Sequence, residues 1–350
     1  MTVNFSVDRN PREVVAAAAD AIAMGMGFDV ERPHPLARLI CEDGALGTIA
    51  HAAGLKNGRG LAGGNRIAAM SSGIGTDDFK DALGQAGLQV TVATYGKQAQ
   101  HLAFCGVVEA KNYQPFDVPG LGLEVSPQLL GPNAEISWGT VESVGGAQGI
   151  RLGRYARLFG VTRRAVVNNE VLEIGRMFAA YGAATSRLEA RLVAAALESS
   201  GSMDDAQPVF HADFGNLATP GAFDEDALNE AIRLLRRQRA PGGEYADLEL
   251  RHLVVEPELE ATARRVIREA GMDVQVAAMA DLPAGRWYAL ADQTLAPTIA
   301  VVRLLGAQKP LRVESRPKDS IHIDGIAVKG VADLGAAMLG RVGIVRGSAA

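Results

Sequence analysis

The sequence Leu152-Gly-Arg-Tyr-Ala-Arg-Leu-Phe-Gly-Val-Thr-Arg-Arg-Ala-Val-Val-Asn-Asn169 leads into one long amphipathic segment that organises the chain. From Val171 the apolar residues recur every three or four positions, which places them on one helix face: Val171, Ile174, Phe178, Tyr181, Leu188, Leu192 and Ala195. Asn168 or Asn169 suits the N-cap, and Ser200-Gly201-Ser202 suits the end. The pattern predicts a spine helix of about thirty residues, well past the usual dozen.

Two glycines, Gly175 and Gly182, lie inside this predicted helix. Each costs roughly 1 kcal/mol relative to alanine in a helix interior. A helix that contains them is expected to pack closely against a neighbour at those positions, or to bend there.

The composition indicates a folded protein without a strongly basic surface. The chain has 350 residues, 48% of them hydrophobic and 21% charged, and a formal net charge of −5. The negative net charge argues against a basic surface that binds nucleic acid directly. It still allows the protein to enclose nucleic acid without binding it tightly. Cys41 and Cys105 suggest reduced thiols rather than a disulfide framework. We expect a soluble protein without a signal peptide or membrane span.

Helices are expected over residues 11–26 and 36–41 and again from Thr76, followed by strands over 88–93 and 102–108. Between them, residues 44–75 are rich in glycine and alanine and suggest a flexible arm. The segment from Gly58 to Gly64 lacks the Lys-Ser or Lys-Thr of a phosphate-binding loop, so we favour a flexible segment there.

Residues 111–148 carry four prolines and only short extended runs. So long a loop is unusual inside a compact domain, and the alternative is a two-stranded arm that neighbouring copies stabilise. The chain would then return as a strand over residues 150–158.

The second half mixes helices and strands without regular alternation, which predicts an α+β fold. Helices are expected over 224–239 and from Pro257, with Gly271 as the stop. Strands are expected over residues 250–255, 287–291, 299–304, 311–315 and 321–334.

His211 and Asp213 are the best enzymatic candidates, because a histidine and a carboxylate two residues apart can bind a metal or exchange protons. We favour a structural turn, with Asn216 in a left-handed conformation. Cys105 is interpreted as a core residue. The arginines of the 224–239 helix are interpreted as a solvated face, with a subunit or phosphate contact as the alternative: Arg233, Arg236, Arg237 and Arg239.

Four blocks, in order, resemble the major capsid proteins of tailed phages with the Hong Kong 97 fold, in the branch of the Mu-like major head subunit. They are Thr76–Phe79, Tyr155–Asn169, Phe210–Leu217 and Leu253–Ala263. The resemblance runs over residues 76–346. Asn169 stands where the family commonly has an acidic residue, and Phe214 where a second histidine is expected, which further weakens a metal site in that block.

The resemblance implies a Hong Kong 97-type α+β capsid fold with a long spine helix, a peripheral domain, an axial domain and an extended β-hairpin arm, the E-loop. The implied domains are a scaffold-like or linker arm over 1–75, the start of the peripheral domain over 76–110, the extended arm over 111–152, the peripheral domain with the spine helix over 153–215, the axial domain over 216–310 and the C-terminal peripheral strands over 311–350.

The resemblance also implies a structural protein rather than an enzyme, with no catalytic residues, cofactor or metal. Its copies would form the hexamers and pentamers of an icosahedral virion shell, assembled in the host cytoplasm. The shell would enclose phage double-stranded DNA without sequence-specific binding, with scaffold, portal and decoration proteins as further partners and no membrane.

Two other functions stay open at this point. An encapsulin-like nanocompartment shell protein would share the fold and enclose an enzyme rather than DNA. A metal-dependent hydrolase centred on His211 and Asp213 is the remote alternative.

Overall fold

The computed structural model describes residues 11–35, 37–42, 77–123, 141–143, 145–162, 164–165, 168, 170–199, 201–240, 243–307, 309–316 and 325–349. The glycine-rich segment expected over 44–75, including Gly58–Gly64, lies outside these residues. Within them, no helix combines the length and the hydropathy that a bilayer span requires.

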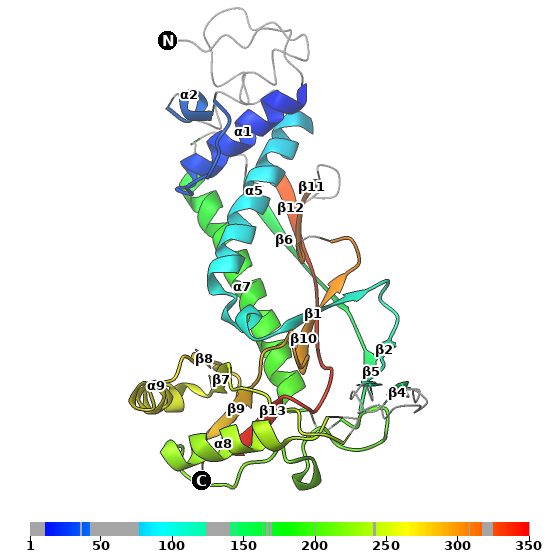
Figure 1. Ribbon diagram of the computed structural model, residues 1–350. Coiled ribbons are helices and arrows are strands. Elements are labelled where there is room, and N and C mark those ends of the chain that lie inside the picture. The colour runs from blue at the N-terminus through cyan, green and yellow to red at the C-terminus, as the bar shows by residue number, and fades with distance from the viewer. Residues whose placement is uncertain are drawn as a thin grey trace, which may run out of the picture. The chain divides into compact units, whose positions relative to one another are not determined.

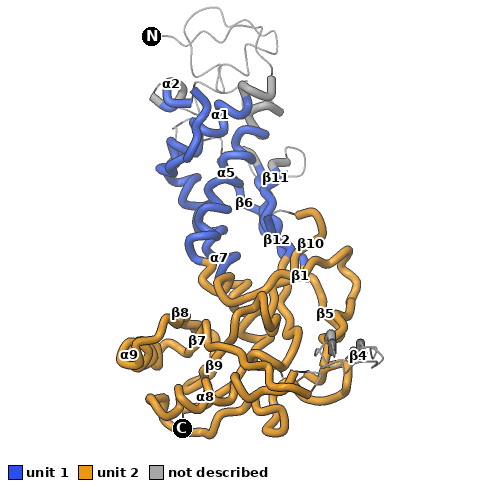
Figure 2. Tube along the Cα trace, viewed as in Figure 1, with its two compact units in different colours: residues 1–98, 154–187, 308–333 blue, residues 99–153, 188–307, 334–350 orange. Residues whose placement is uncertain are grey.

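The chain divides into two compact units, each assembled from separate segments (Figure 2). Unit 1 comprises residues 1–98, 154–187 and 308–333, and unit 2 comprises residues 99–153, 188–307 and 334–350. Helix α7 (Val171–Leu197) and strand β12 (Gly325–Met338) contribute residues to both units. The peripheral, axial and arm assignments stay predictions, because neighbours in a shell define them.

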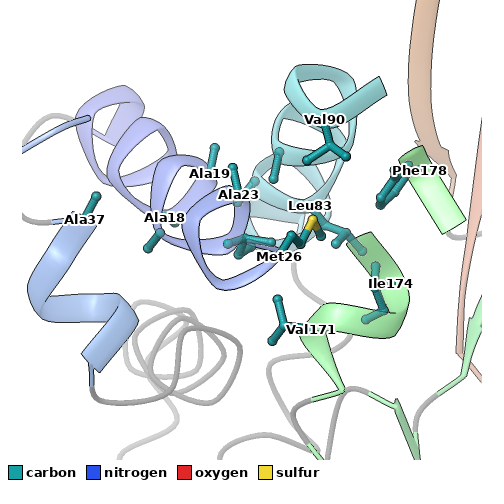
Figure 3. Packing of buried hydrophobic residues seen from close by; sticks show 14 of the residues in the cluster. Ala18, Ala19, Ala23, Met26, Ala37, Leu83, Val90, Val171, Ile174 and Phe178 are labelled. Atoms are coloured by element: carbon teal, nitrogen blue, oxygen red, sulfur yellow. The ribbon is translucent and has the colours of Figure 1, made fainter. Parts of the chain in front are cut away.

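Unit 1 has a core of helices, which Figure 1 shows, and many of the buried residues of these helices are small. It contains α1 (Pro11–Gly25), α2 (Ala37–Glu42), α5 (Asp77–Gln98) and the first part of α7. The alanine-rich face of α1 lies against Leu83 and Val90 of α5, and Val171, Ile174 and Phe178 of α7 complete the cluster (Figure 3). Small side chains let the helix backbones approach closely, so apolar area is buried without large residues.

The two glycines of α7 lie where the sequence predicts close packing. A Cβ at Gly175 would lie 2.6 Å from the Cβ of Met26. A Cβ at Gly182 would collide with the backbone carbonyl oxygen of Thr91 in α5. Thr91 also donates its hydroxyl to the carbonyl of Phe178 at 3.3 Å. Close packing, the first of the two predicted reasons for these glycines, is confirmed.

One sheet is organised around the long strand β12. Its order is β1 (Gly106–Ala110), β10 (Ile299–Leu304), β12 and β11 (Leu311–Arg316), and β6 (Gly153–Thr162) also pairs with β12. Strands β1 and β10 are parallel, whereas β10 and β11 are both antiparallel to β12. The predicted strands over 299–304 and 311–315 are confirmed, and the last one extends to Met338.

Unit 2 contains a second sheet in the order β13 (Ile344–Ser348), β9 (Arg286–Leu290), β7 (His252–Val255) and β8 (Gln275–Ala278). Helices α8 (Glu225–Arg237) and α9 (Glu260–Glu269) bury Leu228, Leu235 and Val266 in a cluster with Trp287. Asp224 caps α8 by accepting from the Ala227 amide at 3.0 Å. Short 3-10 turns complete the unit: η1 (Gln100–Ala103), η2 (Ala212–Phe214) and η3 (Pro257–Leu259).

The segment predicted to be a two-stranded arm forms two short antiparallel ladders. Strand β2 (Phe116–Val118) pairs with β5 (Ala147–Ile150), and β3 (Leu121–Leu123) pairs with β4 (Val141–Ser143). The chain therefore runs out and back over the same segment, as a hairpin does. The return strand β6 starts at Gly153 rather than at 150.

Two predicted strands are wrong in whole or in part. Residues 88–93 belong to helix α5, where Val90 is fully buried in the unit 1 core. The β-branched residues favour a strand locally, but packing against α1 and α7 overrides this weak preference. The strand expected over 102–108 begins only at Gly106, after the turn η1.

The spine helix α7 starts at Val171 and contains 27 residues. Glu170 therefore holds the N-cap position, and Asn168 donates its side-chain amide to Glu170 at 2.9 Å. Asn169 lies outside the described residues. The helix ends at Leu197, before the expected Ser200–Ser202 stop. Ala195 is exposed, because the buried face of the second half runs through Glu189 and Val193 instead.

Candidate functional site

The block Phe210–Leu217, which contains the enzymatic candidates, is a tight turn around one buried amide. The side chain of Asn216 is inaccessible to solvent. It accepts from the backbone N–H of His211 at 2.9 Å and donates to the carbonyl of Val209 at 2.7 Å. Gly215 has the left-handed conformation, with φ of 62°, so the prediction that placed it on Asn216 is wrong by one residue.

His211 and Asp213 lie on the outside of this turn. Their side chains are 52% and 83% exposed. His211 Nδ1 accepts from the Asp213 backbone N–H at 3.3 Å and lies 3.2 Å from its Oδ2. Among the residues that the structure describes, no three His, Cys, Asp or Glu side chains gather as metal ligands do. The arrangement is that of a local cap, the structural turn favoured from the sequence.

Removing the imidazole is expected to change little. His211→Ala should alter the free energy of unfolding by less than about 0.5 kcal/mol, because the side chain is largely exposed and its contacts are local. Thermal unfolding and electron microscopy of the variant measure stability and assembly together. Loss of a bound metal or of a hydrolytic activity on this change would revive the hydrolase alternative.

Phe214, which replaces the histidine expected from the resemblance, supports a buried arginine. The guanidinium of Arg341 lies 4.2 Å from the centroid of the Phe214 ring. Arg341 is 9% exposed and donates to both carboxylate oxygens of Asp205, at 2.7 and 2.8 Å. Arg341 holds the pKa of Asp205 below its usual range. Their pair therefore stabilises the folded state at neutral pH and is lost only in acid.

Asp204, next to Asp205 in the sequence, forms hydrogen bonds with Gly146 at the base of the predicted arm. Asp204 accepts from the Gly146 backbone N–H at 2.7 Å, and its own N–H donates to the Gly146 carbonyl at 2.9 Å. A side chain at Gly146 would collide with the backbone of residues 118–120 on the outgoing strand. The turn therefore makes hydrogen bonds in two directions: Asp204 bonds to Gly146, just before β5, and Asp205 bonds to Arg341.

A second group of residues resembles a nucleophilic site in composition only. Cys105, His252 and Asp292 line one cavity of unit 2. Burial raises the pKa of the Cys105 thiol and lowers the pKa of His252. The thiol therefore stays protonated at neutral pH, and the reactive species of a cysteine is the thiolate. Cys105 behaves as the core residue that its sequence context predicts.

The most unusual electrostatic feature, which the sequence analysis missed, is a buried carboxylate in α7. Glu189 is inaccessible to solvent, with Oε2 2.9 Å from Nε2 of the buried His101. Its other oxygen forms an ion pair with Arg303 of β10. Arg303 interrupts the apolar run of residues 299–304, and a lone arginine in a buried strand is a signal that it has a buried partner.

The arginine cluster predicted on the 224–239 helix lies partly beyond α8, which ends at Arg237, and it contacts the residues that follow. Arg236 contacts Asp247 at 2.7 Å and Glu249 at 3.2 Å. Arg239 lies 5.1 Å from the centroid of the Tyr245 ring and donates to the Gly243 carbonyl at 2.6 Å. Only part of the cluster is a simple solvated face, because these two side chains contact residues within 243–249.

A family model described as "Phage capsid protein" matches residues 146–347. Among solved structures, the capsid of an empty GTA particle is 13% identical, with a TM-score of 0.51, over 72% of this chain and 90% of that chain. A structure from Microbacterium phage Oxtober96 is 10% identical, with a TM-score of 0.48, over 72% of this chain and 91% of that chain. An encapsulin complex from Synechococcus elongatus is 12% identical, with a TM-score of 0.44, over 71% of this chain and 86% of that chain. No curated protein matches the sequence.

At 13% identity, the likeness to the GTA capsid shows a shared fold. The family match confirms the predicted resemblance to tailed-phage capsid proteins and the function of a major capsid shell protein. The Mu-like branch stays a prediction, since the family model describes phage capsid proteins in general. Because the match spans more than half of its residues, the chain belongs to the phage capsid protein family and has the Hong Kong 97-type α+β fold.

Proposed function

We propose that this chain is a Mu-like major head subunit whose copies form the hexamers and pentamers of an icosahedral shell around phage double-stranded DNA. Scaffold, portal and decoration proteins are its further partners, and assembly takes place in the host cytoplasm. The proposal is carried by the family match over residues 146–347. The formal charge of −5 suits a container that encloses DNA without holding it.

The proposal extends to the division of the chain. Residues 1–75 form the N-terminal arm, residues 111–152 the extended arm, and residues 216–310 the axial domain around which a capsomer closes. The ladders β2–β5 and β3–β4 support the arm, because two-stranded ribbons of this size are marginally stable alone and gain from a neighbour's surface.

Electron microscopy of the purified protein, with size-exclusion chromatography, tests the function. Closed shells, or rings of five and six subunits, are the expected result. A protein that stays monomeric both alone and with its scaffold protein would contradict the proposal. A cargo enzyme that co-purifies inside the shells would favour the nanocompartment instead.

Shortening the arm tests its role in the same assay. Replacing residues 121–143 by Asn-Gly keeps the β2–β5 ladder and the Gly146 contacts with Asp204. We expect a folded subunit, with a midpoint of thermal unfolding close to that of the wild type, that no longer builds closed shells. Normal shells from this variant would show that the segment is not needed to join subunits.

A further inference from the structure

Helix α1, helix α2 and the turn between them lie within the proposed N-terminal arm, yet they form part of the core of unit 1. We call this segment, residues 11–42, the N-terminal clamp. Among the described residues, the buried cluster of unit 1 has eight members from the clamp and nine from the rest of the unit. The eight are at most 5% exposed: Ala17, Ala18, Ala19, Ala21, Ile22, Ala23, Met26 and Ala37. The clamp therefore supplies nearly half of the buried residues of this core.

The shapes of α1, α5 and α7 are complementary where these helices meet (Figure 3). A Cβ at Gly175 of α7 would lie 2.6 Å from the Cβ of Met26, so α7 approaches the end of the clamp too closely for any side chain at that position. In the same way, Gly87 of α5 leaves room for the ring of Phe178 in α7. The contact is thus the close packing of a folded core and not the loose contact of a tethered tail.

A carboxylate of α1 adds specific polar contacts to this packing. Asp20 Oδ2 accepts from the backbone N–H of His34 at 2.8 Å, which fixes the turn between α1 and α2. Asp20 Oδ1 accepts from the side-chain amide of Gln89 at 3.0 Å, which joins α1 to α5. One side chain therefore fastens the clamp both to itself and to the rest of unit 1.

Removal of the clamp would open the core of unit 1. The faces of α5 and α7 that meet it carry large apolar side chains, such as Leu83 and Ile174, which are at most 4% exposed. Their loss of cover would create a contiguous apolar surface, which folded proteins rarely expose and which promotes aggregation. A segment that is removed during maturation is not expected to cover such a surface.

We infer that the N-terminal clamp is a permanent part of the folded subunit and not a scaffold segment that maturation removes. Its noncovalent contacts with α5 and α7 hold it in place even when the chain is broken between α2 and α5. Scaffold function in the shell therefore falls to residues outside the clamp or to a separate protein. This last consequence rests on the proposed function, whereas the permanence of the clamp does not.

An engineered break in the chain tests the inference. A recognition site for a sequence-specific protease is inserted after residue 56, between α2 and α5, and the purified full-length subunit is cut there. We expect the fragment that carries the clamp to elute together with the rest of the subunit in size-exclusion chromatography, because a buried apolar interface does not need the covalent link. Separation of the two fragments under native conditions would overturn the inference.

Ala19→Asp and Ala16→Asp are a matched pair of variants on α1. Ala19 is 1% exposed, whereas Ala16 is exposed. Ala19→Asp buries a carboxylate without a partner, so the dissociation constant of the cut fragment should rise by about a hundredfold or more. Ala16→Asp should change it by less than about threefold. Failure of Ala19→Asp alone to fold would also support the inference, whereas equal retention of both fragments would contradict it.

Mass spectrometry of subunits from assembled shells provides a second readout. The expected subunit contains residues 11–42, and mature shells whose subunits lack them would refute the inference. Absence of shells would count against the proposed function, but it would leave the result on the cut subunit unchanged.

Discussion

Gly182→Val is expected to lower the free energy of unfolding by about 3 kcal/mol or more, the upper range for overpacking a tight core. The new Cβ would collide with the Thr91 carbonyl oxygen. A flexible side chain could rotate away, but this neighbour is backbone within helix α5. Either α5 or α7 must therefore shift, and the hydrogen bond from Thr91 to the Phe178 carbonyl would be lost with the shift.

Gly96→Ala, in helix α5, is expected to change the free energy of unfolding in the opposite direction. Gly96 is exposed in α5, and no described residue beyond its own helical turn has an atom within 4 Å of the position that a Cβ would take. Alanine there should raise the free energy of unfolding by up to about 1 kcal/mol, because glycine is the poorer helix former. Chemical denaturation of both variants measures the two effects. Equal stability of Gly182→Val and the wild type would show that the two helices do not touch at Thr91.

Glu189→Ala is expected to destabilise the subunit by about 3–5 kcal/mol, the range for removing one partner of a buried ion pair. The change leaves Arg303, which is 9% exposed, without this carboxylate, and removes the hydrogen-bond partner of the buried His101. A buried charge that loses a counter-charge loses much of the compensation for its lost hydration. Denaturant unfolding and the yield of folded subunit measure the loss.

Two further variants separate charge from packing. Glu189→Gln keeps the size and part of the hydrogen bonding, so its loss should lie between those of the wild type and the alanine variant. Glu269→Ala removes an exposed carboxylate whose partner, Arg265, is also exposed, and it should cost less than about 1 kcal/mol. A similar small loss for Glu189→Ala would mean that water reaches Arg303 in the folded subunit.

Much of the fold could be predicted because its signals are local. The 3.6-residue period predicted the start of α7, and the two glycines predicted its close packing. The apolar period predicted a helix over 224–239, close to the observed α8; Asp224 is its N-cap, because its short acidic side chain meets the first-turn amides. The strand over 299–304 was predicted because an apolar run of that length suits a buried strand.

The errors concern choices that only the assembled core makes. Apolar residues lie on several faces of the second half of α7, including Leu188, Leu192 and Val193, so the hydrophobic pattern leaves the rotation of the helix ambiguous, and the predicted face was shifted toward Ala195. Residues 88–93 have strand-like side chains but pack as a helix. The connection from Arg341 through Asp205 to the base of the arm joins residues far apart in sequence, and no spacing rule predicts such a contact.

The order in which the segments are synthesised follows from the shared strand β12. Strands β6, β10 and β11 all pair with it, yet it occupies residues 325–338, which follow all three in the sequence. A nascent chain on the ribosome therefore holds β6, β10 and β11 before it holds the strand with which all three pair. Non-local pairings of this kind form late in folding. The sheet accordingly cannot close before residues 325–338 have left the ribosome.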